Sequence, residues 1–270
     1  MTIPKFIDKQ WRLFATGFSF TVFGIGAFFI AIGLLLFLYP IPFSKTKKQI
    51  WTRRTISFAT RFYVRMMRKF GLLSFEFKNT DRLGNNGELI IANHPSLLDV
   101  VFILSVMPDA CCIVKEALWR NPFTFGAVSM AGYISNNSNG PELVDKASKT
   151  IKTGQSLIIF PEGTRTSNLE QLNFQRGAAN IALKAACPIR PILIGCEPMT
   201  LRKHESWYQI PVAPPLFTIE ALDALVIKDC IDTNRPSVVQ ANHLNQYLQQ
   251  TILSELQVRK LVPKDEPINK

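Results

Sequence analysis

Hydrophobic residues near the N-terminus form one long run. Between Arg12 and Lys45 there is no charged residue, and 14–39 consists mostly of Phe, Ile, Leu, Ala and Gly. A helix of about 25 residues is roughly 38 Å long, enough to cross the core of a bilayer. The run predicts a retained membrane helix, since a signal peptide has a shorter apolar region and a cleavage site of small residues. A bent segment that dips into one leaflet stays open as an alternative, because the run contains Gly24, Gly26 and Gly33.

A second helix is predicted after Pro40 and Pro42. Over 47–70, apolar residues recur at spacings of three and four, and arginines share the opposite side. The apolar positions are Ile56, Ala59, Tyr63, Met67 and Phe70, and the arginines are Arg54, Arg61, Arg65 and Arg68. Such a helix either lies in the lipid headgroup layer or packs against the rest of the protein. We therefore expect a membrane-anchoring two-helix segment over 1–72 and a second domain over 73–270.

The remainder of the chain alternates between short β-like runs and helical stretches. This alternation predicts an α/β fold, a mixed and largely parallel sheet with flanking helices. Helices are expected over 97–107, over 139–154, which starts at Asn139-Gly140-Pro141 and stops at Gly154, and over 237–258. The expected strands are 88–92, 110–115, 133–135, 156–160, 189–195 and 216–220.

Charge is distributed unevenly along the chain. The net charge is +11, but nine cations and no anion lie within 45–69. Removing these nine from the 31 Lys and Arg leaves 22 cations against 20 acids, so the rest of the chain is nearly neutral. A basic block directly after an apolar helix indicates the cytoplasmic face and attraction to anionic lipids, so we expect membrane lipids and no nucleic acid as partners.

The five cysteines form an odd set without metal-ligand spacing. Four of them lie in apolar, strand-like runs, which predicts reduced thiols that pack in the core and a reducing compartment. No metal cluster, glycine-rich dinucleotide loop or haem signature is present, so no metal site and no bound cofactor are expected.

The first chemical motif is Asn93-His94-Pro95-Ser96-Leu97-Leu98-Asp99, which follows an apolar run. Ser96 is a good N-cap, which would place Asp99 in the first turn of the next helix. Helical side chains tilt toward the N-terminus, so Asp99 points back at His94. The carboxylate can fix the imidazole tautomer and leave the other ring nitrogen to take a proton, as a general base does. Alternatively, Ser96 and Asp99 are a capping pair and His94 a polar loop residue.

The second motif, Phe160-Pro161-Glu162-Gly163-Thr164-Arg165, also follows an apolar run. A flexible glycine, backbone amides, a hydroxyl and a guanidinium predict a seat for phosphate or carboxylate. A polar turn with Arg165 in a surface ion pair is the alternative. No serine or cysteine stands out as a nucleophile, which favours direct attack by a substrate hydroxyl that His94 deprotonates.

Together the two motifs resemble those of the glycerolipid acyltransferase family, which includes 1-acylglycerol-3-phosphate and related lysophospholipid acyltransferases. The likeness extends to Phe174-Gln175-Arg176-Gly177 and to Cys187-Pro188-Ile189-Arg190-Pro191-Ile192, and it covers about 75–198. An apolar helix followed by a basic amphipathic one is also typical of this family. The resemblance implies a fold like that of the glycerol-3-phosphate acyltransferases, with an acyltransferase domain over 73–270.

The resemblance implies transfer of a fatty acyl group from acyl-CoA or acyl-ACP, as co-substrate, to a lysophospholipid hydroxyl. By motif match, His94 is the base and Asp99 its partner. The acceptor-headgroup site is Glu162, Gly163, Thr164 and Arg165, with Lys115 and Arg176 as helpers. Acyl carrier protein is an implied partner, and the cytoplasmic face of a bacterial inner membrane is the implied location.

One family element departs from the pattern. The family's second block commonly ends in an arginine, whereas Gly132-Tyr133-Ile134-Ser135-Asn136-Asn137 runs into Ser138. Since that arginine is associated with the acceptor phosphate, its absence leaves room for a specialised, non-glycerophosphate acceptor. Two further hypotheses stay open: a thioesterase, in which the same pair activates water, and a lipid-binding protein without turnover.

Overall fold

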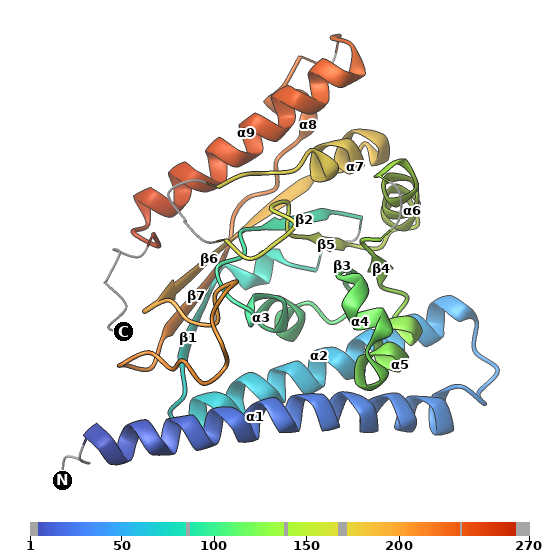
Figure 1. Cartoon of the computed structure of the whole chain (residues 1–270). Coiled ribbons are helices and arrows are strands. Elements are labelled where there is room, and N and C mark those ends of the chain that lie inside the picture. Colours follow the sequence, from blue (N-terminus) through green and yellow to red (C-terminus); the bar gives the residue numbers. More distant parts are fainter. Residues whose placement is uncertain (1–4, 85–86, 138–139, 167–171, 233, 263–270) are drawn as a thin grey trace.

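The fold is built on a mixed sheet flanked by helices on both faces (Figure 1). The computed structural model describes residues 5–84, 87–137, 140–166, 172–232 and 234–262. Within them is a seven-stranded sheet in the order β1-β7-β6-β2-β5-β3-β4. The strands are β1 (Ser74–Lys78), β2 (Leu89–Ala92), β3 (Cys111–Val114), β4 (Ile134–Ser135), β5 (Leu157–Ile159), β6 (Ile189–Glu197) and β7 (Leu216–Ala221).

The largely parallel sheet predicted from the sequence is confirmed. Strands β6, β2, β5, β3 and β4 pair in parallel, whereas β7 is antiparallel to β6 and parallel to β1. Every residue of β2 is fully buried, which explains its continuous apolar sequence. Each of the six predicted strands is present within two residues of its expected ends, and β1 is an additional edge strand.

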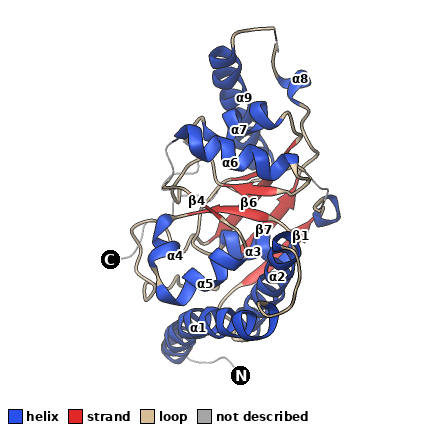
Figure 2. Ribbon diagram, turned by 90° about the vertical axis from the view of Figure 1, so that its right-hand side faces the viewer, coloured by secondary structure: helices blue, strands red, loops and turns tan. Residues whose placement is uncertain are grey.

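Helices cover the two faces of the sheet in separate groups (Figure 2). One face carries α6, α7 and α9, and the opposite face carries α3, which in turn packs against α2. The helix bounds are α1 (Lys5–Gly33), α2 (Lys45–Lys69), α3 (Asp99–Val106), α4 (Glu116–Arg120), α5 (Pro122–Met130), α6 (Gly140–Lys152), α7 (Gly177–Ala185), α8 (Ile227–Cys230) and α9 (Ser237–Val258). A π-helical turn, Leu34–Leu38, extends α1, and a 3-10 turn, Thr80–Arg82, follows β1.

The apolar N-terminal run forms one helix that lies flat along the domain, beside α2 and beneath α5 (Figures 1 and 2). It starts at Lys5, earlier than the run itself, and continues without a break through the glycines that the sequence offered as a bend. Its contacts extend along its length: the ring of Phe23 lies 5.3 Å from that of Tyr63, and the ring of Phe28 lies 5.8 Å from that of Phe123. Near its C-terminal end, a Cβ added to Gly126 of α5 would lie only 2.7 Å from the Cβ of Ala31.

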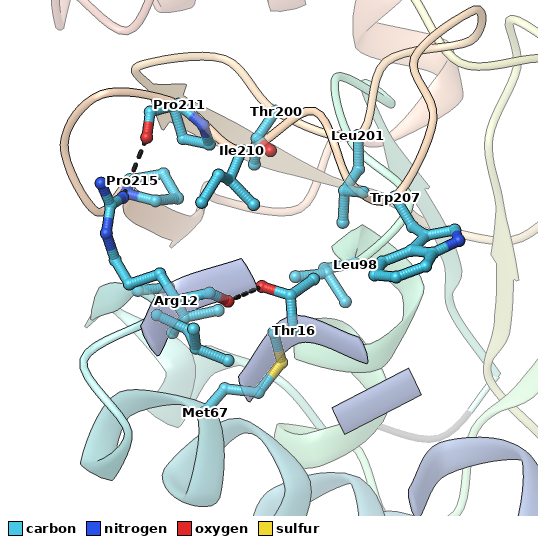
Figure 3. Close-up of a pocket in the computed structure, with 12 residues that line it drawn as sticks. Arg12, Thr16, Met67, Leu98, Thr200, Leu201, Trp207, Ile210, Pro211 and Pro215 are labelled. Carbon is cyan, nitrogen blue, oxygen red and sulfur yellow. Dashed lines mark hydrogen bonds between the residues drawn. The ribbon is translucent and has the colours of Figure 1, made fainter. Parts of the chain in front are cut away.

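The N-terminal half of α1 is fastened to the loop before β7 (Figure 3). The guanidinium of Arg12, a buried residue, donates hydrogen bonds to the carbonyls of Pro211 and Val212 at 2.9 and 2.7 Å. A cavity of about 30 Å³ remains between α1, α2 and this loop. It has room for about two water molecules, which is too little for a lipid chain.

The outer face of α1 is an exposed apolar ridge. Residues at spacings of three, four and seven along this face are exposed, including Phe14 at 67% and Phe29 at 64% exposure. The other members of the ridge are Ile7, Trp11, Phe18, Ile25 and Leu36. A continuous apolar surface of this length requires an apolar environment, and α1 is also long and apolar enough to cross a bilayer by length and composition. The ridge therefore indicates association with a membrane.

The apolar side of α2 packs against the protein. Tyr63 and Met67 are buried, and Ile56, Ala59 and Phe70 are partly buried, so the predicted apolar row faces α3 and α1. Arg54, Arg61, Arg65 and Arg68 are exposed on the other side, as predicted.

Arg53 belongs to the basic block that the charge distribution assigned to the membrane surface, but it lies inside the protein. It is 3% exposed, and its guanidinium donates to the carbonyl of Ala131 at 2.8 Å, to Gln155 Oε1 at 2.7 Å and to the carbonyl of Asp109 at 3.3 Å. These bonds join α2 to three separate turns of the domain.

The thiols of Cys111, Cys112, Cys187 and Cys196 are free and buried, and Cys230 is free and half-buried, in agreement with core packing. Among the described residues, no group of three or more His, Cys, Asp and Glu side chains could hold a metal ion. The expected start of α6 at Asn139 lies outside the described residues, whereas its stop is clear, since Gly154 adopts φ +83°.

Replacing Arg53 tests how α2 is held. We expect Arg53→Ala to lower the free energy of unfolding by about 3 kcal/mol, because three acceptors lose the donor that the buried guanidinium supplies and the stem leaves a void. The adjacent Arg54→Ala is the matched control, since its pair with Asp109 is solvent-exposed and screened. Chemical unfolding of the full chain in detergent measures both. Equal unfolding midpoints for the two variants would show that the hydrogen bonds of Arg53 do not hold α2 in place.

Candidate active site

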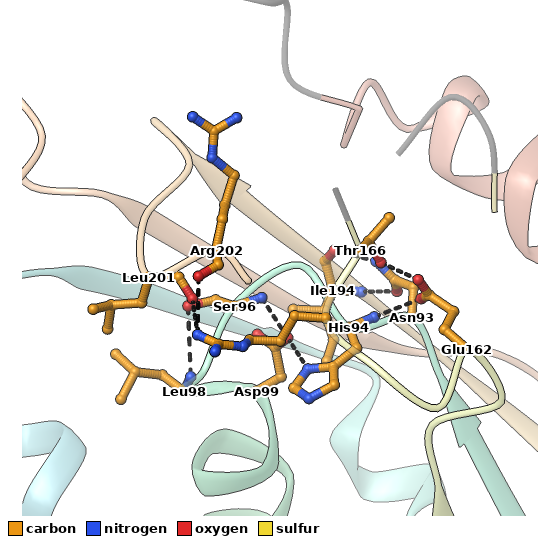
Figure 4. Close-up of polar contacts among 11 residues, drawn as sticks. Asn93, His94, Ser96, Leu98, Asp99, Glu162, Thr166, Ile194, Leu201 and Arg202 are labelled. Atoms are coloured by element: carbon orange, nitrogen blue, oxygen red, sulfur yellow. Dashed lines mark hydrogen bonds and ion pairs between the residues drawn. The ribbon is translucent and has the colours of Figure 1, made fainter. Parts of the chain in front are cut away.

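His94 and Asp99 are joined directly. His94 follows β2, Asp99 is the first residue of α3, and His94 Nδ1 lies 2.8 Å from Asp99 Oδ2 (Figure 4). The same carboxylate oxygen accepts the backbone N–H of Ser96 at 2.7 Å. The intervening turn is therefore closed by the carboxylate. Ser96 is not the N-cap that the sequence suggested, because α3 begins after Leu98 and Asp99 itself accepts the free N–H of the turn.

The second ring nitrogen of His94 is left for a substrate. A carboxylate partner at Nδ1 selects the tautomer that carries its proton there, so Nε2 has a free lone pair. The ring stacks on Phe160 at the end of β5, with centroids 4.2 Å apart. The side chain of His94 remains 14% exposed, whereas that of Asp99 is fully buried. The pair thus presents one basic nitrogen at the surface of an otherwise closed site.

The environment of Asp99 increases its hold on the imidazole. Burial raises the pKa of Asp99, and its bond with His94 opposes that rise. Its second oxygen, Oδ1, is buried and accepts no hydrogen bond within the described part of the chain. A carboxylate with so little solvation binds a neighbouring positive charge strongly, so it stabilises an imidazolium that forms at His94.

Glu162 and Thr166 hold the backbone of His94. Glu162 Oε1 accepts the His94 N–H at 2.9 Å, and the Thr166 N–H donates to the His94 carbonyl at 2.7 Å. The hydroxyl of Thr166 donates to the other oxygen of Glu162, which closes the ring of contacts. Both side chains are buried, and burial raises the pKa of Glu162. In the free protein, Glu162 is therefore engaged in positioning His94.

Asn93 fastens the same turn to β6. Its amide donates to the carbonyl of Ile194 and accepts the N–H of Ile194, both at 2.8 Å. The side chain imitates a peptide group and continues the pairing of β2 with β6 beyond Ala92. The turn with His94 is thus held from both sides of β2, by Phe160 directly after β5 and by Ile194 of β6.

Arg165 is turned toward the loop after β6. Its Nη1 donates to the carbonyls of Leu201 and Arg202 at 2.7 and 3.0 Å. The carbonyl of Leu201 also accepts the N–H of Leu97 at 3.3 Å, which joins this loop to the turn that carries His94. The charge of Arg165 lies near enough to Asp99 to lower the pKa of that carboxyl.

The predicted anion seat retains a suitable backbone. Gly163 adopts φ +68°, a conformation that favours glycine, and its N–H closes a turn onto the Phe160 carbonyl at 3.0 Å. In the part of the chain that the structure describes, the N–H groups of Thr164 and Arg165 have no hydrogen-bond acceptor. Two adjacent free amides after a left-handed residue are the geometry of small anion-binding loops.

The two helper residues lie farther out. Lys115 is exposed and follows β3, which lies next to β5 in the sheet, so it shares the carboxyl edge with His94. Arg176 is exposed and donates to Asn242 of α9 at 3.3 Å. Neither residue contacts the His94–Asp99 pair within the described residues. In the departing family block, Asn136 accepts the N–H of Glu116 at 3.0 Å, and Ser138 lies outside the described residues.

Sequence reasoning missed several residues of this site. Thr166, Phe160 and Asn93 lie within or next to the two motifs, but nothing in their spacing showed that they hold His94 in place. Leu201 and Arg202 lie far along the chain, and only the loop after β6 brings their carbonyls to Arg165.

Comparison with known proteins identifies the motif-bearing segment. The acyltransferase family matches residues 74–195. This segment, 122 of the 270 residues, is similar to the acyltransferase family. The chain is 24% identical to the human 1-acyl-sn-glycerol-3-phosphate acyltransferase beta over 189 residues, 67% of this chain and 66% of that protein. It is 30% identical to the 1-acyl-sn-glycerol-3-phosphate acyltransferase of Saccharomyces cerevisiae over 142 residues, 50% of this chain. It is also 30% identical to the 1-acyl-sn-glycerol-3-phosphate acyltransferase of Helicobacter pylori over 131 residues, 46% of this chain.

The chain spans 47% to 66% of the length of these three relatives. Its fold agrees with a solved acyltransferase structure across nearly the whole chain. The 1-acyl-sn-glycerophosphate acyltransferase PlsC from Thermotoga maritima superposes with a TM-score of 0.72, covering 93% of this chain and 98% of that one at 17% identity. Most of the N-terminal helices α1 and α2 is therefore included in the shared fold.

A pH series on Glu162→Gln tests the burial of that carboxyl. Because burial raises the pKa of Glu162 in the folded state, ionising it costs folding free energy. This cost is absent below the usual glutamate pKa and fully present above the raised one. We expect the wild type to lose stability relative to Glu162→Gln as the pH rises above the usual glutamate pKa of about 4.3, measured by chemical unfolding. The exposed Glu76→Gln is the control, and a pH-independent difference would count against the buried carboxylate.

Proposed function

We propose that this protein is a membrane-bound O-acyltransferase that moves a fatty acyl group from an acyl thioester, acyl-CoA or acyl-ACP, to the hydroxyl of a lysophospholipid such as 1-acylglycerol-3-phosphate. The observation that carries the proposal is the 2.8 Å contact between His94 Nδ1 and a fully buried Asp99, with Nε2 left free. The family match over 74–195 and the names of the three relatives support the same chemistry.

The proposed step is a direct transfer. His94 Nε2 takes the proton of the acceptor hydroxyl while the hydroxyl oxygen bonds to the thioester carbonyl carbon. The tetrahedral intermediate then expels the thiolate by breaking the C–S bond, and the thiolate takes the proton back from His94. Asp99 stabilises the imidazolium between these two events. The thioester is already activated, so orientation and one proton transfer are the main requirements.

The acceptor headgroup is proposed to bind at the turn of Gly163, Thr164 and Arg165. Two free amides and the nearby guanidinium favour a phosphate there, and Lys115 on the same sheet edge adds a cation. Glu162 contributes by holding His94, and Arg176, which contacts α9, is proposed to act from the rim. Acyl-CoA or acyl-ACP serves as co-substrate, so no bound cofactor is required in this scheme.

Substitution of the pair tests the mechanism. We expect His94→Ala to lower kcat for acyl transfer by roughly 100-fold to 10,000-fold, because it removes the base. Asp99→Asn should lower kcat by at least about 100-fold while leaving KM for the thioester little changed, since the amide cannot stabilise the imidazolium. Transfer of radiolabelled acyl groups to lysophospholipid in vesicles measures both. His204→Ala, which alters a histidine outside the site, is the control, and turnover retained by His94→Ala would reject the base.

The same assay separates transfer from the alternatives. Mass spectrometry of the products with and without a lysophospholipid distinguishes an acylated lipid from a free fatty acid, which a thioesterase would release. A panel of lysolipid headgroups then identifies the acceptor, including a non-glycerophosphate one. Lipid binding without any product would favour the lipid-binding hypothesis.

We further propose that α1 is embedded lengthwise in one leaflet, on the cytoplasmic face of a bacterial inner membrane, with 1–72 as the anchor and 73–270 as the acyltransferase domain. The contacts of α1 with the domain extend from Arg12 to Ala31, so a perpendicular span would pull the domain into the bilayer core. Its apolar ridge and the exposed Trp51, Phe58 and Phe62 of α2 suit the interface of a single leaflet.

Membrane binding can be tested on the ridge of α1. Phe29→Asp should shift the protein from the membrane to the supernatant by at least tenfold, because a ring loses about 2 kcal/mol of apolar burial and a charge is added. Val238→Asp, an equally exposed apolar position on α9, should remain membrane-bound. In sealed vesicles, protease added on the side of the domain should also reach the N-terminus. An N-terminus protected from that protease would show a spanning helix instead.

A further inference from the structure

A groove lined by cations lies between α2, β1 and α3. It has a volume of about 670 Å³. One side consists of the exposed cations Arg61, Arg65, Arg68 and Lys69 of α2. The other side is apolar and consists of Phe75, Phe77 and Val106. The residues that line it all belong to the described part of the chain and include no carboxylate.

The cations are arranged around this groove by specific contacts. Arg61 donates through Nε to the carbonyl of Ser105 at 3.0 Å, which fixes its guanidinium at the end of α3. The guanidinium of Arg68 lies 5.3 Å from the ring centre of Phe75. No salt bridge neutralises Arg61, Arg65, Arg68 or Lys69 within the described residues. Four positive charges therefore surround a space with apolar walls, which is the complement of an anionic amphiphile.

The groove is separate from the catalytic site. Asp99 is the first residue of α3, whereas Val106 is its last, so the two ends are about 10 Å apart along the helix axis. The described residues that line the groove include none of those that contact His94 or Asp99. A ligand in this groove would not contact the reacting atoms.

The position of the groove on α2 selects its occupant. Trp51, Phe58 and Phe62 form one exposed row along the helix, and the groove cations form the adjacent row. If the aromatic row enters the leaflet beside the ridge of α1, the cations lie at the depth of the lipid headgroups. An acidic protein would match the charge but would leave the apolar wall of Phe75 and Phe77 without a partner.

We infer that this groove binds the phosphate group of an anionic phospholipid, a membrane lipid bound outside the catalytic site, with the upper part of its acyl chain against Phe75 and Phe77. This inference rests on the proposed embedding of α1 in one leaflet. It adds headgroup selectivity at a defined place, beyond the general attraction of a basic helix to an anionic surface.

Site-specific photocrosslinking tests the inference. The full chain is reconstituted in vesicles of equal phosphatidylglycerol and phosphatidylcholine, with benzoylphenylalanine at position 77, and crosslinked lipids are identified by mass spectrometry. We expect roughly tenfold enrichment of phosphatidylglycerol. The enrichment should disappear in Arg65→Gln/Arg68→Gln and persist in Lys149→Gln/Lys152→Gln, which removes two charges from α6. A second probe at position 106 replaces the first should the Phe77 variant not fold.

A probe at position 29 distinguishes lipid binding in the groove from membrane embedding of α1. On the ridge of α1 it should crosslink both lipids equally. Lipid crosslinks at position 29 but none at position 77, or no headgroup preference at position 77, would overturn the groove site and leave membrane embedding intact. An absence of lipid at both positions would overturn the embedding itself. Preferential crosslinking of added acyl carrier protein at position 77 would also reject the lipid.

Discussion

The organisation of the candidate site depends on one buried carboxylate. Asp99 accepts the imidazole of His94 and the N–H of Ser96 with a single oxygen, and both bonds are shorter than 3 Å. Desolvating a carboxylate is expensive unless donors compensate for it, so the turn between β2 and α3 is held in the one geometry that supplies them. The bonds of Asp99 that stabilise the turn also leave Nε2 of His94 available to take a proton. The same carboxylate therefore fixes the local fold and prepares the base.

The surroundings of His94 extend this constraint outward. Glu162 and Thr166 hold its backbone from the loop after β5, and Asn93 ties the turn to β6. Parallel pairing of β2 with both neighbours brings these loops to one edge of the sheet, where ligands of α/β folds commonly bind. Rigid strands thus place a base that is held both at its ring, by Asp99 and Phe160, and at its backbone, by Glu162 and Thr166.

The loop after β6 connects this site to the N-terminal helix. Its beginning receives Arg165 at the carbonyls of Leu201 and Arg202, and its later part receives Arg12 at Pro211 and Val212. Trp207, between these two points, packs against Gly17 of α1, where a Cβ would lie 3.2 Å from its ring. The helix with the apolar outer ridge is therefore part of the same packed unit as the candidate site, and the two keep a fixed relation to one another.

Much of this protein follows from local sequence. Continuous apolar runs predicted the buried strands, because a strand covered on both faces has no polar side to show, and the spacing of His94 and Asp99 predicted their contact because helix geometry relates neighbouring turns. Other features depended on contacts between distant segments. Arg53 and Arg61 look alike in the sequence, yet one is buried among carbonyls and the other lines a groove, and Arg165 meets the carbonyl of Leu201. The sequence by itself determined six of the seven described strands, the long helices and the groups that can do chemistry. Only the tertiary structure decided which of those groups meet and which face α1 turns outward, because burial and hydrogen bonding are properties of the packed chain as a whole.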